Sequence, residues 1–170
     1  MGKLAEYVRT EAGRLKAEID KQAEAVAEWK AAVGRLYAQL QIWTAEADGG
    51  YGLLRLRIGR TVSVNDPGLG AYDAEVLTVA LGSRTADIVP RARYVAAAIR
   101  PPGREPRRAD GKVEITDGAA ATAFLFRLKG PAGDEWFIRP VWLWNSDPAF
   151  GTVEPLDREQ FEAVVLGILQ

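Results

Sequence analysis

One long helix-forming stretch constrains this chain of 170 residues more than any other feature. No proline occurs between Lys3 and Asp48, most residues in that range favour helix, and Gly49-Gly50 follow as a stop signal. At a rise of about 1.5 Å per residue, such a helix is roughly 70 Å long. The remaining ~120 residues, folded compactly, have a radius of gyration of only ~14 Å. The helix must therefore project beyond its own domain or fold back on itself.

The apolar residues of this helix form two different patterns. In its first half they are Leu4, Val8, Ala12, Leu15, Ile19, Ala23 and Val26. In its second half they are bulkier, namely Trp29, Val33, Leu36, Leu40 and Trp43. The first spacing is close to an eleven-residue repeat, whereas the second alternates three and four like a heptad seam. We expect residues 26–48 to pack on the protein's own sheet, and the N-terminal half to project and pair with a second chain. The residues predicted to mediate self-association are Leu4, Val8, Leu15 and Ile19.

After Gly50 the pattern changes to the period of two that is typical of strands. The expected strands are 54–58, 62–64, 77–81, 86–88, 94–99, 113–115, 119–129 and 135–144. The expected turns are Gly59-Arg60, Asp66-Pro67-Gly68, Gly82-Ser83 and Asp117-Gly118. Residues 100–111, with several prolines and arginines, are expected to be an irregular loop.

A short helix closes the chain, with Asp157 as its predicted N-cap and Leu156 placed to pack against Phe161. No helix separates successive strands, so the sheet should be antiparallel. The predicted fold class is α+β, with the long N-terminal helix and the short C-terminal helix packed on a curled sheet of six to eight strands. Residues 51–170 should form the β domain with its closing helix, as one folding unit with residues 26–48. Residues 1–48 form the long helix, and its N-terminal half projects.

Two features could bind a ligand. The strand at 135–144 is apolar on both faces, so either the sheet curls into a half-barrel or an aromatic face is left for a ligand or partner. The arginine-rich loop could bind an oxyanion, because guanidinium groups match such groups in shape and charge. The residues of this alternative reading, a binding module for a small anionic ligand such as a nucleotide, are Arg100, Arg104, Arg107, Arg108, Trp142 and Trp144. A solvated loop and a buried strand explain the same residues without a ligand.

Composition restricts the chemistry. The chain has 22 Lys plus Arg, 23 Asp plus Glu, no histidine and no cysteine. Catalytic triads that use histidine, thiolate nucleophiles, and metal sites built on histidine or cysteine are therefore impossible. Glu24 with Glu28 and Asp134 with Glu135 are carboxylate pairs, but we expect the first on a solvated helix face and the second in a turn. We expect no enzyme activity, cofactor or metal, and the balanced charge favours neither nucleic acid nor a membrane as partner.

The stretch Ala25–Trp29 with Leu36, Leu40 and Trp43, followed by a short strand domain, resembles a family of small, functionally uncharacterised bacterial proteins. These share a long leading helix with paired tryptophans, a β-rich middle and a closing helix. The resemblance implies a bacterial, cytoplasmic setting and no activity. The sequence thus predicts a homodimer whose long helices associate as a coiled coil. It also predicts that the protein binds a further protein partner.

Overall fold

The computed structural model describes residues 2–96, 98–141 and 151–170, and it has the expected α+β fold. The helices are α1 (Lys3–Asp48) and α2 (Arg158–Leu169). The first strands are β1 (Leu54–Asp66), β2 (Gly70–Leu81), β3 (Arg84–Ala92), β4 (Ala98–Arg100) and β5 (Arg107–Arg108). The later strands are β6 (Gly111–Thr116), β7 (Ala121–Gly130), β8 (Gly133–Pro140), β9 (Gly151–Thr152) and β10 (Glu154–Pro155).

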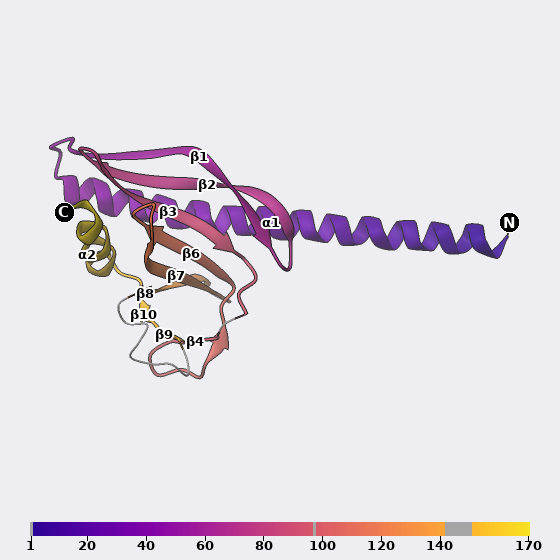
Figure 1. Cartoon of the computed structure of the whole chain (residues 1–170). Coiled ribbons are helices and arrows are strands. Elements are labelled where there is room, and N and C mark those ends of the chain that lie inside the picture. The colour runs from indigo at the N-terminus through magenta and orange to yellow at the C-terminus, as the bar shows by residue number, and fades with distance from the viewer. Residues whose placement is uncertain (1, 97, 142–150) are drawn as a thin grey trace.

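The main sheet is antiparallel and open, with the strand order β1-β2-β3-β6-β7-β8-β10. A smaller sheet has the order β5-β4-β9. Figure 1 shows α1 running along the main sheet and then continuing far beyond it toward the N-terminus.

The C-terminal end of α1 is built by local chemistry. Gly49 adopts the left-handed conformation, with φ of 60°, and its N–H reaches the carbonyl oxygen of Ala45. The Asp48 carboxylate then accepts hydrogen bonds from the backbone N–H groups of Gly52, Leu53 and Leu54 at 2.6–2.9 Å. These bonds turn the chain from the helix into β1.

Several of the expected strand boundaries are wrong, and β2 begins at Gly70 where the pattern placed its start at Leu77. The predicted turn at Gly59-Arg60 does not exist, because β1 continues through these residues with a bulge between Ile58 and Arg60. A lone glycine inside a strand is typical of such a bulge. The predicted strand 94–99 is reduced to β4, because the Asp66 carboxylate accepts hydrogen bonds from the N–H groups of Arg93 and Tyr94. These groups therefore need no strand partner.

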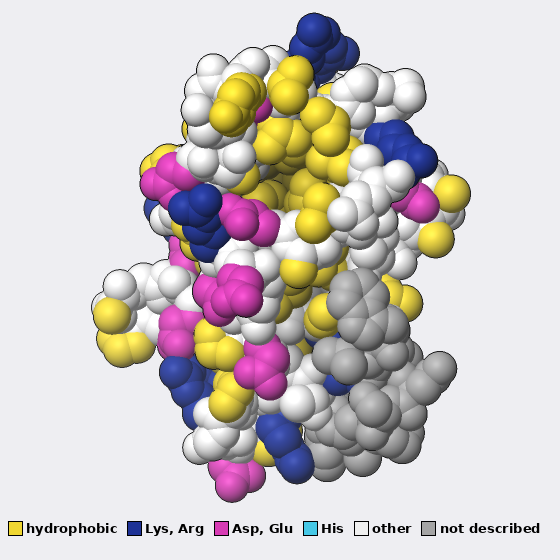
Figure 2. Space-filling model, turned by 90° about the vertical axis from the view of Figure 1, so that its left-hand side faces the viewer, with side chains coloured by type: hydrophobic (Ala, Val, Ile, Leu, Met, Phe, Trp, Pro, Cys, Tyr) yellow, Lys and Arg dark blue, Asp and Glu magenta, His cyan; other side chains and the backbone are white. Residues whose placement is uncertain are grey.

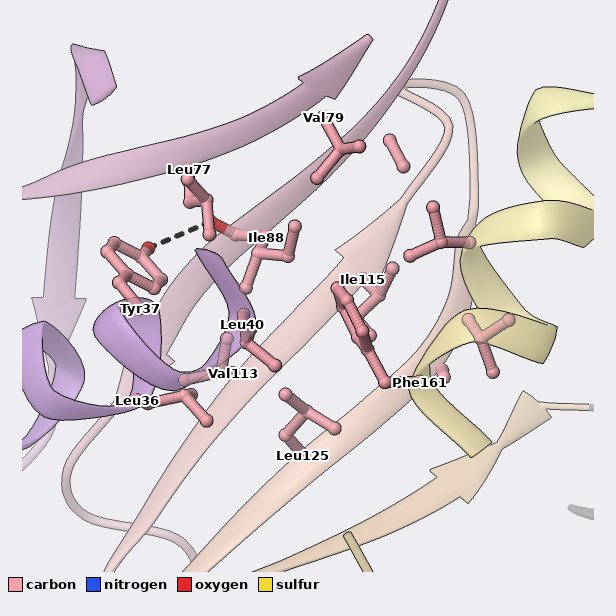
Figure 3. Close-up of a cluster of buried hydrophobic side chains, with 14 of the residues drawn as sticks. Leu36, Tyr37, Leu40, Leu77, Val79, Ile88, Val113, Ile115, Leu125 and Phe161 are labelled. Carbon is pink, nitrogen blue, oxygen red and sulfur yellow. Dashed lines mark hydrogen bonds between the residues drawn. The ribbon is translucent and has the colours of Figure 1, made fainter. Parts of the chain in front are cut away.

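The face of the main sheet that lies against both helices carries the larger core. Figure 3 shows how side chains from α1, α2 and four central strands meet there. The Tyr37 hydroxyl of α1 lies 2.9 Å from the carbonyl oxygen of Ile88 and 2.8 Å from that of Glu75, so it can donate to either. Burial raises the pKa of Tyr37, so this hydroxyl stays protonated.

The opposite face of the sheet is also buried. Phe126 of β7 and Phe137 of β8 pack there with Ile99 of the small sheet and with Val153. The second cover that β8 requires is therefore the small sheet, and the main sheet does not close. Trp142 and Trp144 lie outside the described residues.

The start of α2 agrees with the sequence. Asp157 is the N-cap, and its carboxylate accepts a hydrogen bond from the N–H of Gln160 at 2.8 Å. Phe161 and Val165 of this helix are buried in the larger core. The expectation of two helices on one face of the sheet is thus confirmed.

Candidate interaction surfaces

The projecting half of α1 carries a row of exposed apolar side chains. Every residue from Gly2 to Glu24 is exposed except Glu11, which is half-buried. Figure 1 shows this half lying clear of the sheet. The four residues predicted to mediate self-association retain 50–75% of their full exposure. We call Leu4, Val8, Leu15 and Ile19 the apolar row.

The apolar row continues the face by which α1 packs on the sheet. An α-helix turns by about 100° per residue, which places the four side chains in one sector about 60° wide. Val26, Val33 and Leu40 fall in the same sector. Val33 and Leu40 are buried in the larger core. One face of α1 is therefore core along half of its length and exposed along the other half.

The charges beside the apolar row are paired within the helix. Arg14 donates hydrogen bonds to Glu11 at 2.9 and 3.0 Å and to Glu18 at 2.6 Å. All three side chains remain partly exposed, so these pairs add little stability. Because the charge of Arg14 offsets only one of the two carboxylates, these three side chains leave that flank with a single net negative charge.

A buried ionic cluster fastens α1 to the sheet where the helix enters the β domain. The side chain of Arg127 in β7 is only 1% exposed. It donates to Glu28 of α1 and to Asp134 of β8, in the second case at 2.7 Å. Arg35 of α1 also donates to Asp134, at 2.7 Å. The cluster therefore ties two turns of α1 to β7 and β8 and sets the direction in which the N-terminal half projects.

Both carboxylates of this cluster are held in the ionised form. The hydrogen bond from Arg127, assisted by its charge, keeps the pKa of Glu28 below the ordinary value. Burial acts to raise the pKa of Asp134, but the hydrogen bonds and charges of Arg35 and Arg127 together outweigh burial and lower it. The expectation that Glu28 lies on a solvated face beside Glu24 is thus wrong for Glu28. The sequence of the helix does not indicate that Glu28 pairs with Arg127, because Arg127 lies 99 residues further along the chain.

A groove of about 540 Å³ lies at the other end of α1, between the last turn of that helix, the paired ends of β1 and β2, and α2. Figure 2 shows the apolar hollow on this side of the molecule. Its large exposed apolar side chains are Tyr51, Leu53, Leu81 and Leu166. An exposed apolar hollow of this size is typical of a surface that contacts a ligand or a protein. Sequence reasoning missed the groove, because three separate segments form it.

The arginines of the 100–108 loop contact groups of the same chain. Arg104 donates to the Glu135 carboxylate at 2.7 Å, and this hydrogen bond lowers the pKa of Glu135. Arg107 lies 3.7 Å from the Asp110 carboxylate. Arg100 belongs to β4 and is also engaged in an interaction. An anionic ligand would have to compete with these carboxylates.

Arg108 is engaged with an aromatic side chain. Its guanidinium lies 4.6 Å from the centre of the Tyr94 ring and donates to the Tyr94 hydroxyl at 3.1 Å. Arg104 lies in the loop between β4 and β5, whereas Arg107 and Arg108 form β5, so the expectation of an irregular loop over residues 100–111 is wrong for these two residues. Trp142 and Trp144, the aromatic part of the predicted ligand site, lie outside the described residues.

Within the described residues, no group of three or more acidic side chains is placed to hold a metal ion. In the same part of the chain, no helix combines the length and apolar content that crossing a membrane requires. Comparison of the chain with protein-family models, with curated proteins and with solved structures found no match.

Proposed function

We propose that this protein is a non-enzymatic interaction module that self-associates through the N-terminal half of α1 and whose β domain presents a surface to another protein. One observation carries the proposal. The core-facing side of α1 continues, exposed and apolar, for about six helical turns beyond the sheet. The helix face that is covered by the sheet in one half carries aliphatic side chains in the half that the described chain leaves open.

The size of the apolar row sets the expected strength of association. Complete burial of a Val, Leu or Ile side chain stabilises by ~1.5–3 kcal/mol, so the eight partly exposed side chains of two copies contribute on the order of 10 kcal/mol. This is similar to the estimated ~4–15 kcal/mol cost of bringing two chains together. We therefore expect a weak dimer that forms at micromolar concentrations or above and dissociates on dilution.

The groove beside α2 supports the second part of the proposal. It exposes Leu53, Leu81 and Leu166 at the end of α1 opposite the apolar row. A protein partner seated there and a second copy on the row would not compete for the same surface. We further propose a bacterial, cytoplasmic setting, which the sequence resemblance implies.

Paired variants of α1 test the proposal. Leu15→Gln with Ile19→Gln removes half of the apolar row and keeps good helix formers. Thr10→Gln with Ala17→Gln makes the matched change on the exposed opposite face. Molar mass is measured by light scattering after gel filtration over a concentration series. We expect the wild-type protein and the control to reach twice 18.5 kDa, and the row variant to stay at 18.5 kDa. A wild-type protein that is monomeric throughout, or a row variant that dimerises like the control, contradicts the proposal.

A further inference from the structure

We infer that two copies pair through the projecting halves of α1 in antiparallel orientation, with Leu4 of one copy opposite Ile19 of the other and Val8 opposite Leu15. The inference rests on the proposed function and adds the orientation and the register of the two helices. Two observations support the inference, namely the spacing of the apolar row and the position of the β domain.

The spacing of the apolar row is the same when read from either end. Leu4 and Val8 are four residues apart, as are Leu15 and Ile19. Both pairs, Leu4 with Ile19 and Val8 with Leu15, are centred on the same point, just before Ala12. A second copy turned end for end about this point therefore places a large apolar side chain opposite a large one in each of the four layers of the apolar row, while Ala12 of each copy lies opposite Glu11 of the other. The small side chain of Ala12 allows the helices to approach closely at the centre.

The position of the β domain excludes the parallel alternative. The sheet lies on the same side of α1 as the apolar row, since Trp29, Val33 and Leu40 pack against it. Paired helices lie about 8–10 Å apart and cross at shallow angles of about 20°. Because α1 is continuous to Asp48, a parallel partner would run beside residues 29–48 and into the volume that the sheet occupies.

The antiparallel arrangement avoids this clash. With the register given above, Lys3 of the second copy lies opposite Asp20 of the first, and its helix ends there. Burial by the β domain begins at Ala25, about five residues or ~7 Å further along the axis. The same clearance holds at the other end by symmetry. Antiparallel pairing also places opposite ends of the two helix dipoles side by side, which is the favourable arrangement.

Distances between spin labels test the orientation and the register in the intact protein. The chain has no cysteine, so a nitroxide can be attached at one introduced cysteine per variant. Thr10→Cys, Ala17→Cys and Glu24→Cys lie at exposed positions on the helix face opposite the apolar row. In the inferred dimer the axial separations of the three labelled pairs are roughly 5, 17 and 38 Å. The distances measured by double electron–electron resonance should therefore increase in the order Thr10, Ala17, Glu24.

Each other outcome has a distinct meaning. Equal distances at all three positions indicate parallel helices, which overturns the inference and leaves self-association intact. Equal distances at Thr10 and Ala17 with a longer one at Glu24 indicate a register centred after Gly13, which overturns the pairing of Leu4 with Ile19. Absence of dipolar coupling at all positions, in samples that light scattering shows to be monomeric, overturns the proposed function itself. Adding Leu15→Gln and Ile19→Gln to the Ala17→Cys variant should abolish the coupling.

Discussion

Trp29 is fully buried where α1 meets the sheet, and its ring lies directly against Gly111 of β6. A Cβ atom placed on Gly111 would lie 2.2 Å from the Trp29 ring. The ring of Trp136 lies on β8 with its centroid 6.2 Å from that of Trp29. Packing thus requires glycine at position 111. The sequence gives no sign of this, because the contact joins residues that are far apart in the chain.

Substitution of two glycines by alanine should change stability in opposite directions. Gly111→Ala forces the Trp29 ring or β6 to move, and we expect it to lower the free energy of unfolding by about 1–3 kcal/mol. Gly34→Ala changes an exposed position in the interior of α1, where a Cβ meets no atom within 4 Å. It should raise the free energy of unfolding by about 1 kcal/mol. Urea unfolding measures both values, and a Gly111→Ala protein as stable as wild type would show that the close contact is wrong.

At the scale of helices and strands, the sequence correctly predicted the features that depend on residues close together in the chain. The end of α1 at Gly49, the cap of α2 at Asp157 and the turn after Asp66 all depend on residues within one or two turns of chain, and the structure confirms them. The bulge at Gly59 and the short β4 depend on pairing with distant segments. For that reason the period-two pattern placed both incorrectly.

The attachment of α1 to the sheet should depend on pH. The folded-state pKa values of Glu28 and Asp134 are lowered, so their contribution to stability is present above the pKa values of the unfolded chain. As the pH falls below about 4, the two carboxylates become protonated and this contribution to stability is lost. Glu28→Gln with Asp134→Asn leaves Arg127 buried without a carboxylate partner and should cost about 3–5 kcal/mol at pH 7. The difference from wild type should shrink steadily as the solution is acidified to pH 3 and below.

Glu24→Gln provides the control for this prediction. Glu24 is exposed and lies one turn before Glu28 on the same helix. Its substitution should change the unfolding free energy by less than about 0.5 kcal/mol. Chemical unfolding at a series of pH values gives the comparison. A difference between the double variant and wild type that does not vary with pH would mean that the ionic cluster does not fasten the helix.

At the scale of the whole molecule, the length of α1 determines which surface is left exposed. A helix of 46 residues exceeds its β domain by simple geometry, so the exposed row could be predicted from spacing and length alone. The groove could not, since Leu53 precedes β1, Leu81 ends β2 and Leu166 lies in α2, and only the tertiary fold brings these three segments together. The side of α1 on which the sheet lies also follows from the spacing, since the apolar stripe of residues 29–43 was expected to pack on the sheet and does so. This feature favours antiparallel pairing.

Amide hydrogen exchange of the intact protein across a dilution series tests the central claim most directly, because it reports on the apolar row itself. A helical segment that packs against no other part of the chain can open from its free end, so its amides are fully protected only when another chain covers the row. We predict that residues 4–24 exchange slowly in concentrated samples and quickly in dilute ones. Residues 29–44, which pack in the core, should be protected at every concentration. Rapid exchange of residues 4–24 at all concentrations would show that no second copy covers this surface.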